Sequence, residues 1–192
     1  MSQQNTNTAN VQQARTVAAV DHGKLDLKAL TLYAILLAAG FVLNLTVSKF
    51  FSGLTGGFLS PEFIIAAFCL EILIIKPNIG QAAVIGLLAG VVIQITASVK
   101  GPDLIAEPVA AVVMALLVSA LSDSKAKGLL PLVGTFIVTF ISGIIYAVIF
   151  SFLIMKNPAF VGVMAPVVAA TGVANAIIVA ALHLPIKKAL KL

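Results

Sequence analysis

The sequence predicts an all-α integral membrane protein in which six transmembrane helices form one compact bundle. Of the 192 residues, 60% are apolar and only 10% are charged, and the mean hydropathy is +1.13. A soluble domain with this balance could not hydrate its surface. The chain also contains six apolar segments of about the length, roughly 20 residues, that a membrane-spanning helix needs.

The six predicted crossings follow one another with short connections. The first covers residues 27–48, and Asp26 is a suitable N-cap for it. The second begins near Pro61, which is a favourable residue at a helix start. Residues 1–26 are polar, and we expect a disordered cytoplasmic tail ahead of a membrane domain of residues 27–192. The remaining predicted crossings are 60–75, 81–98, 104–121, 129–155 and 163–184.

Basic residues are unevenly distributed over the predicted loops. With both termini in the cytoplasm, nine lysines and arginines lie inside and three outside, which obeys the positive-inside rule. The net charge of +5 then follows from topology, and we expect no nucleic-acid partner, because no basic face has room for phosphates. The inner group is Arg15, Lys24, Lys28, Lys76, Lys125, Lys127, Lys187, Lys188 and Lys191, and the outer group is Lys49, Lys100 and Lys156.

Motifs of catalysis are absent from the sequence. No Gly-x-x-x-x-Gly-Lys-Ser/Thr, His-Glu-x-x-His or Gly-x-Ser-x-Gly pattern occurs. His22 and His183 fall on the inner side of the predicted topology, so neither can assist a nucleophile at an outer site. A single cysteine, Cys69, excludes an intrachain disulfide and a multi-cysteine metal site. We therefore expect no enzyme, no catalytic residues, no metal and no cofactor in this chain.

Four polar residues near the outer ends of different predicted helices form the main candidate site. Asn44, Gln94 and Glu107 each lie four residues inside a helix end, which is about 6 Å. Glu62, at the start of the second helix, should lie slightly shallower. Ionisable groups inside a membrane are costly and are functional candidates by default. The alternative for Asn44 and Gln94 is a structural hydrogen bond between helices.

The ligand suggested by these groups is a small zwitterion. The carboxylates can take an ammonium group, while the amides, loop N–H groups or Lys100 can take a carboxylate. Phe58 ends a glycine-rich outer loop, residues 49–58, and belongs to a group of phenylalanines near the outer face. Such rings would suit a flat or aromatic ligand by stacking, although packing explains any single ring equally well.

Two other buried polar residues are predicted to lie outside this site. We expect Asn175 to link helices well below the site. Glu71 should pair with Lys76 or reach toward the inner surface.

Small residues recur four apart on two predicted helices. Gly86 and Gly90 should allow close helix packing inside the bundle. Ala34 and Ala38 either pack in the same way or form a docking surface for a partner.

A family resemblance rests on the Ala34-x-x-x-Ala38 motif, on six predicted helices in a short chain, and on two segments of the sequence. The two segments are Gly56-Gly57-Phe58-Leu59-Ser60-Pro61-Glu62 and Asp103-Leu104-Ile105-Ala106-Glu107-Pro108-Val109. The chain resembles the substrate-binding (S) components of energy-coupling factor transporters, and within them the tryptophan-transporter group. The resemblance covers roughly residues 27–184.

The resemblance implies an organisation and a partner. The ligand would be captured from outside, under the loops 49–58 and 99–103, in a prokaryotic plasma membrane. Ala34 and Ala38 would face a membrane-embedded coupling subunit, which two ATPase subunits on separate chains drive with ATP. The chain contains no tryptophan, so stacking on a bound indole would fall to phenylalanine or tyrosine.

Other functions fit the same sequence. The same kind of subunit could carry a vitamin such as pantothenate. A stand-alone ion-coupled carrier is a second class, although no pair of broken helices typical of such carriers is apparent. A membrane scaffold that binds no small molecule is the third.

Overall fold

The computed structural model describes residues 25–191, and all the regular structure within them is helical. The predicted tail, residues 1–26, lies outside this range except for its last two residues. Asp26 caps the first helix, because its carboxylate accepts a hydrogen bond of 2.8 Å from the Ala29 N–H; that prediction is confirmed. The helices are α2 (Leu27–Leu43), α3 (Lys49–Leu54), α4 (Phe63–Ile75), α5 (Ile79–Thr96), α6 (Asp103–Ala120), α7 (Thr135–Ile149) and α8 (Phe160–Ala189).

Short 3₁₀- and π-helical turns connect α2 to α3 and extend α7 at both ends. A π-helical turn, Asn44–Ser48, joins α2 to α3, so Leu27–Leu54 is one continuous helical stretch of 28 residues. A 3₁₀ turn, Lys125–Leu129, and a π turn, Leu130–Gly134, precede α7, and the π turn Phe150–Ile154 follows it.

Five helical stretches of the described chain are long and apolar enough to cross a membrane. The second predicted crossing, residues 60–75, differs: only α4 is helical, and its 13 residues span about 20 Å, short of the roughly 30 Å of hydrocarbon. Pro61 does not start the helix: α4 begins at Phe63, and Glu62 before it is non-helical, with φ −99° and ψ 86°. The five long stretches are Leu27–Leu54, Ile79–Thr96, Asp103–Ala120, Lys125–Ile154 and Phe160–Ala189.

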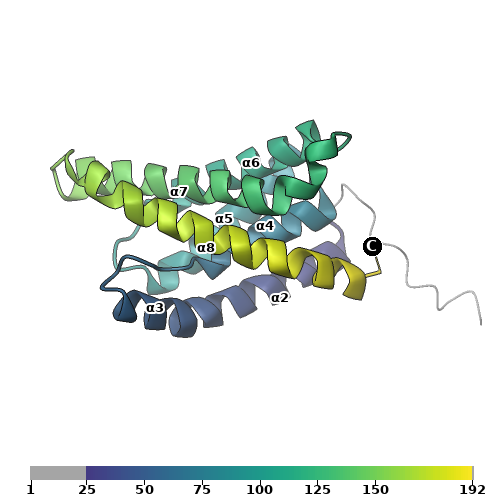
Figure 1. Cartoon of the computed structure of the whole chain (residues 1–192), viewed down its shortest axis with the longest axis horizontal. Helices are drawn as coiled ribbons and strands as arrows, with labels where there is room; N and C mark the ends of the chain where they lie inside the picture. Colours follow the sequence, from purple (N-terminus) through teal and green to yellow (C-terminus); the bar gives the residue numbers. More distant parts are fainter. Residues whose placement is uncertain (1–24, 192) are drawn as a thin grey trace, which may run out of the picture.

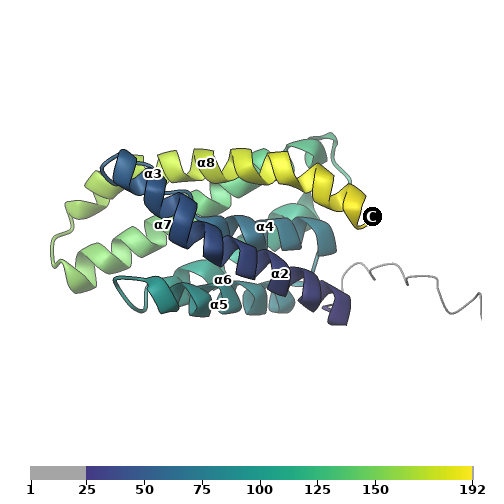
Figure 2. The ribbon, with the colours of Figure 1, turned by 90° about the horizontal axis from the view of Figure 1, so that it is seen from below.

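Consecutive helices run in opposite directions, so α2 begins and α8 ends at the same end of the bundle (Figures 1 and 2). We call this the proximal end, and the opposite end, with the loops 97–102 and 155–159, the distal end. Helix α4 lies in the middle and contacts α2, α5, α6, α7 and α8. Twelve of its 13 residues are buried, so it forms the core around which the longer helices pack.

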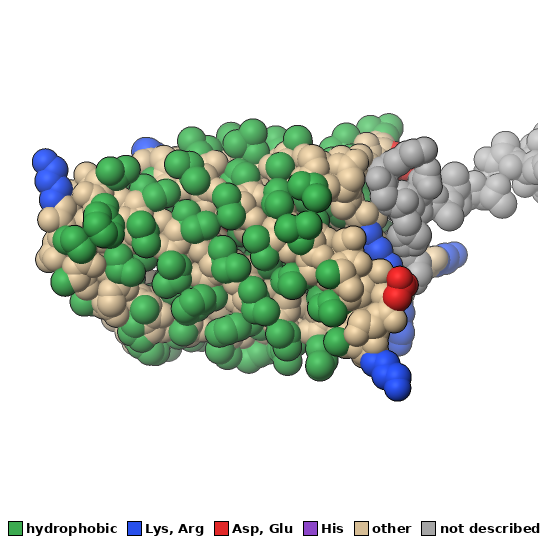
Figure 3. All heavy atoms as spheres, turned by 90° about the horizontal axis from the view of Figure 1, so that it is seen from above, with side chains coloured by type: hydrophobic (Ala, Val, Ile, Leu, Met, Phe, Trp, Pro, Cys, Tyr) green, Lys and Arg blue, Asp and Glu red, His purple; other side chains and the backbone are tan. Residues whose placement is uncertain are grey.

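Apolar side chains cover the sides of the bundle, and lysines gather at its ends (Figure 3). Large apolar residues remain exposed on every long helix; Ile35, Ile95 and Leu153 are each at least 62% exposed. A bilayer, with no water to hydrate polar groups, suits such a surface. The described chain is thus consistent with a multi-pass membrane protein.

Helices α5 and α6 approach closely through glycine. A Cβ atom added to Gly86 would lie 2.5 Å from the Glu107 carbonyl oxygen, and one added to Gly90 would lie 2.7 Å from that of Asp103. The prediction that these two glycines pack inside the bundle is confirmed. Ala34 and Ala38 are exposed on α2 instead, so they contribute no packing within the described chain.

Glu71 does not behave as predicted. Its side chain is 0% exposed, and neither carboxyl oxygen has a hydrogen-bond partner among the described residues. The predicted pairing with Lys76 is therefore wrong.

Candidate functional site

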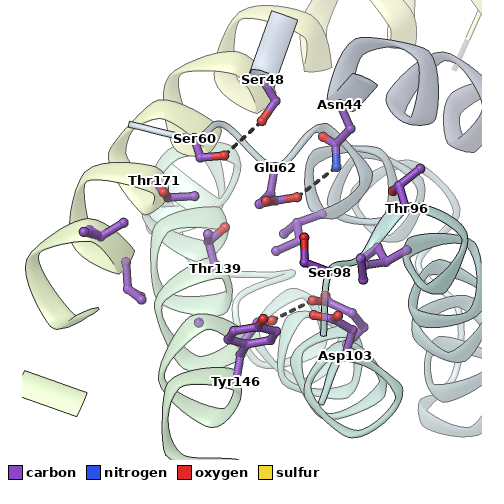
Figure 4. A pocket seen from close by; sticks show the side chains of 18 of the residues that line it. Asn44, Ser48, Ser60, Glu62, Thr96, Ser98, Asp103, Thr139, Tyr146 and Thr171 are labelled. Carbon is purple, nitrogen blue, oxygen red and sulfur yellow. Dashed lines mark hydrogen bonds between the residues drawn. The ribbon is translucent and has the colours of Figure 1, made fainter. Parts of the chain in front are cut away.

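A cavity of about 330 Å³ lies in the distal half of the bundle. Its walls come from the α2–α3 stretch, the non-helical segment before α4, and helices α4 to α8. Lys49 and Ser98 line it and are exposed, whereas Glu107 and Thr139 line it and are buried. The cavity thus extends from the distal surface into the interior. Figure 4 shows Asn44, Glu62, Ser48 and Ser60 along one wall and Tyr146 and Asp103 along another.

Three of the six predicted ligand-binding residues, Asn44, Glu62 and Glu107, line this cavity. The other three, Gln94, Lys100 and Phe58, are absent from its lining.

Gln94 and Lys100 hold the distal loop that follows α5. The Gln94 side-chain oxygen accepts a hydrogen bond of 2.8 Å from the Gly101 N–H, and the Lys100 ammonium donates to the Gln94 carbonyl oxygen. Phe58 is 54% exposed. These three residues therefore shape the surroundings of the cavity without forming its wall.

The start of α4 is fixed by two asparagines from other helices. The Asn44 side-chain oxygen accepts a hydrogen bond of 2.7 Å from the Phe63 N–H, and that of Asn175 accepts one of 2.9 Å from the Glu62 N–H. Both N–H groups would otherwise lack a partner, because the first turn of a helix has no intrahelical acceptor for them. Asn44 and Asn175 thereby tie α2 and α8 to the same point.

These contacts also decide where Glu62 lies. The Asn44 amide donates a hydrogen bond of 2.9 Å to the Glu62 carboxylate, which fixes that side chain against the cavity. Asn175 further donates to the Thr139 hydroxyl, 3.4 Å away. The predicted helix link through Asn175 is confirmed. Its predicted position well below the site is wrong, because α4 begins deep in the bundle and Glu62 contacts Asn175 directly.

The π turn Asn44–Ser48 places several residues of one helix on the cavity. Asn44, Leu45 and Ser48 all line it, and the Ser48 hydroxyl lies 3.0 Å from that of Ser60 in the non-helical segment. Single π turns within α-helices are frequent at functional sites. No sequence pattern used above identifies such a turn.

Glu107 is the most deeply buried acid of the cavity wall. Its side chain is 2% exposed, and Oε1 accepts a hydrogen bond of 2.8 Å from the Ser142 hydroxyl. Oε2 has no partner among the described residues. Buried polar atoms are almost always hydrogen-bonded, so an unpartnered one at a cavity indicates a place for a ligand group or water.

Several lining residues were missed by the sequence reasoning. Asp103 lies four residues before Glu107 and therefore on the same face of α6. Ser142 and Tyr146 are also four apart, on α7. This spacing could have identified both pairs, but Asp103 was assigned to a loop, and hydroxyl groups are common in helix interiors. Other hydroxyl-bearing residues at the cavity are Thr96, Ser98, Thr139 and Thr171.

Tyr146 is the aromatic residue of the cavity lining. Its ring stacks on Phe150 with centroids 6.0 Å apart and planes at 15°, and Phe150 in turn contacts Phe160 at 5.7 Å. The phenylalanines predicted near the outer face do not line the cavity. Phe150 and Phe160 instead support the tyrosine from behind.

The cavity is equipped to bind, with several hydroxyls, one amide, three acids and one lysine on its wall. Among the described residues, no group of three or more His, Cys, Asp or Glu is placed to hold a metal ion. Comparison with known proteins adds no relative: no family model, curated protein or solved structure matches the chain.

Replacing Asn175 with alanine should destabilise the protein by about 1–3 kcal/mol, because the buried Glu62 N–H loses its acceptor. Thermal unfolding in detergent micelles would measure the change. Val173→Ala is the matched control, since Val173 lies on the same helix and is 51% exposed. Equal effects of the two substitutions would mean that Asn175 does not hold the start of α4.

Proposed function

We propose that this chain is the substrate-binding S component of an energy-coupling factor importer in a prokaryotic plasma membrane. It captures tryptophan or a similar small zwitterion from outside for ATP-driven uptake. The observation that carries the proposal is a cavity of about 330 Å³ inside a bundle with apolar sides, lined by Glu107, a buried acid whose Oε2 has no partner among the described residues. A volume of this order is at the lower end of the range for small-molecule sites, roughly 300–1,000 Å³.

The proposed topology has six crossings and both termini in the cytoplasm. Helix α4 and the non-helical segment before it together make the second crossing. Non-helical backbone at membrane depth is tolerated where it is buried in protein or lines a cavity, and Ser60 and Glu62 of this segment do line one. The distal end is then the outer end.

The lysines support this orientation. In the described chain, seven lie at the proximal end and three at the distal end, an asymmetry that favours a cytoplasmic proximal end. The proximal group is Lys28, Lys76, Lys125, Lys127, Lys187, Lys188 and Lys191, and the distal group is Lys49, Lys100 and Lys156.

The partners in this proposal are a membrane-embedded coupling subunit and two ATPase subunits. Ala34 and Ala38 lie on an exposed face of α2, where small side chains let a second helix approach closely. ATP is used by the partners, and this chain needs no cofactor of its own.

A stand-alone ion-coupled carrier is the second candidate, and Glu71 is the observation that favours it. A fully buried carboxyl group without a hydrogen-bond partner is a potential proton-binding site. Uptake into vesicles that contain only this chain, driven by a proton gradient, would support the carrier. The importer subunit should show no such uptake.

Ligand binding tests the proposal directly. Tryptophan should raise the unfolding temperature of the purified protein, because a ligand that binds only the native state stabilises it. Pantothenate, screened in parallel, tests the vitamin alternative. Glu107→Gln should weaken binding about tenfold or more, through loss of a carboxyl hydrogen-bond partner. If no amino acid or vitamin shifts the unfolding temperature, the proposed capture function is wrong.

Docking is tested on the exposed face of α2. Ala34→Trp and Ala38→Trp should abolish uptake and co-purification with the coupling subunit, yet leave ligand binding unchanged, because neither alanine lies at the cavity. Ile35→Trp is a control for bulk at a neighbouring exposed position, 62% accessible. Loss of ligand binding in the alanine variants would contradict the assignment of this face to a partner.

A further inference from the structure

The acids and bases of the cavity wall are unequal in number. Glu62, Asp103 and Glu107 line it, and Lys49 is the one basic residue among the lining residues. A ligand that enters therefore meets more negative than positive groups whenever the acids are ionised. This excess of acids bears on the net charge of a ligand that the cavity can bind.

The three acids are not equally engaged. Glu62 receives the hydrogen bond from Asn44 and interacts electrostatically with Lys49. Asp103 and Glu107 lie on one face of α6, and they are only 8% and 2% exposed. Because Glu107 retains an unpartnered oxygen, the acidic face of α6 can accept further donors.

Helix α7 adds groups that suit a cation. Ser142 of α7 orients Glu107 through its hydroxyl, and Tyr146, one turn further along α7, lines the cavity together with Asp103. Figure 4 shows the Tyr146 ring on the same side of the cavity as Asp103. An aromatic face beside carboxyl groups attracts an ammonium or guanidinium group, since the ring's negative face adds to their charge.

Some of the groups that would bind a ligand carboxylate are occupied. A helix N-terminus is a ready-made anion site, and α4 begins at this cavity. Its Glu62 and Phe63 N–H groups, however, already donate to Asn175 and Asn44. Lys49, exposed at the distal edge, is the charged partner that the lining offers to an anionic group.

We propose that the ligand carries a net positive charge, with a protonated amine held between Asp103, Glu107 and Tyr146. A carboxylate, if the ligand has one, lies at the distal edge beside Lys49. The inference rests on the proposed capture function and narrows it. A simple amine or a basic amino acid fits this arrangement better than tryptophan does, because it supplies at least one more positive than negative group.

Two matched ligand series test the charge preference on the unaltered protein. The first is tryptamine, tryptophan and indole-3-propionate, and the second is cadaverine, 5-aminopentanoate and glutarate. Within each series the skeleton is similar while the amine is retained or replaced by a carboxylate. Thermal shift and equilibrium binding should rank the amine first and the carboxylate last in at least one series, with a difference of about tenfold or more.

Charge-removing variants assign the preference to α6. Asp103→Asn and Glu107→Gln should each reduce the difference between amine and carboxylate, whereas Asp123→Asn, at an exposed position outside the cavity, should leave it unchanged. Tryptophan binding that exceeds tryptamine binding and is insensitive to both α6 variants would overturn this inference and leave the capture function standing. Failure of all six compounds to bind would overturn both.

Discussion

The cavity depends on the hydrogen bonds that fix the start of α4 inside the bundle. A helix that begins in an apolar interior exposes N–H groups that no water can satisfy, and each unsatisfied group would be costly. Asn44 and Asn175 supply the acceptors. Because α4 starts there, the preceding backbone is non-helical, and the space that another helical turn would fill becomes part of the cavity.

The same arrangement explains how several acids are tolerated in an apolar protein. Glu62 is held by Asn44 and Glu107 by Ser142, so each has one fixed donor. Both acids line the cavity, and the Oε2 atom of Glu107 has no partner among the described residues. A structural network would satisfy its members fully, because partly satisfied buried networks are destabilising. The unpartnered carboxyl oxygen of Glu107 therefore argues for a binding role.

Much of the helical pattern was predictable from sequence, because it depends on local features. The length of an apolar segment and the N-cap at Asp26 act within one helix, and the small residues Gly86 and Gly90 act between two helices that are neighbours in the chain. The depth of Glu62 was not predictable, since it depends on Asn175, more than one hundred residues away. Gln94 was predicted to face the site, yet it does not line the cavity, and its side chain bonds the distal loop. Helix position alone does not determine the partner of a flexible amide, and the π turn at Asn44 changes which residues face inward.

The central claim is that an outward-facing cavity takes a small ligand, and cysteine labelling tests it most directly. The one native cysteine, Cys69, is buried, so Ser60→Cys introduces a reporter at the cavity wall with little change in size. In intact cells a membrane-impermeant maleimide should label this cysteine, and an amine ligand should slow the labelling. Labelling only after the cytoplasmic side is exposed, or labelling that no ligand slows, would contradict the account.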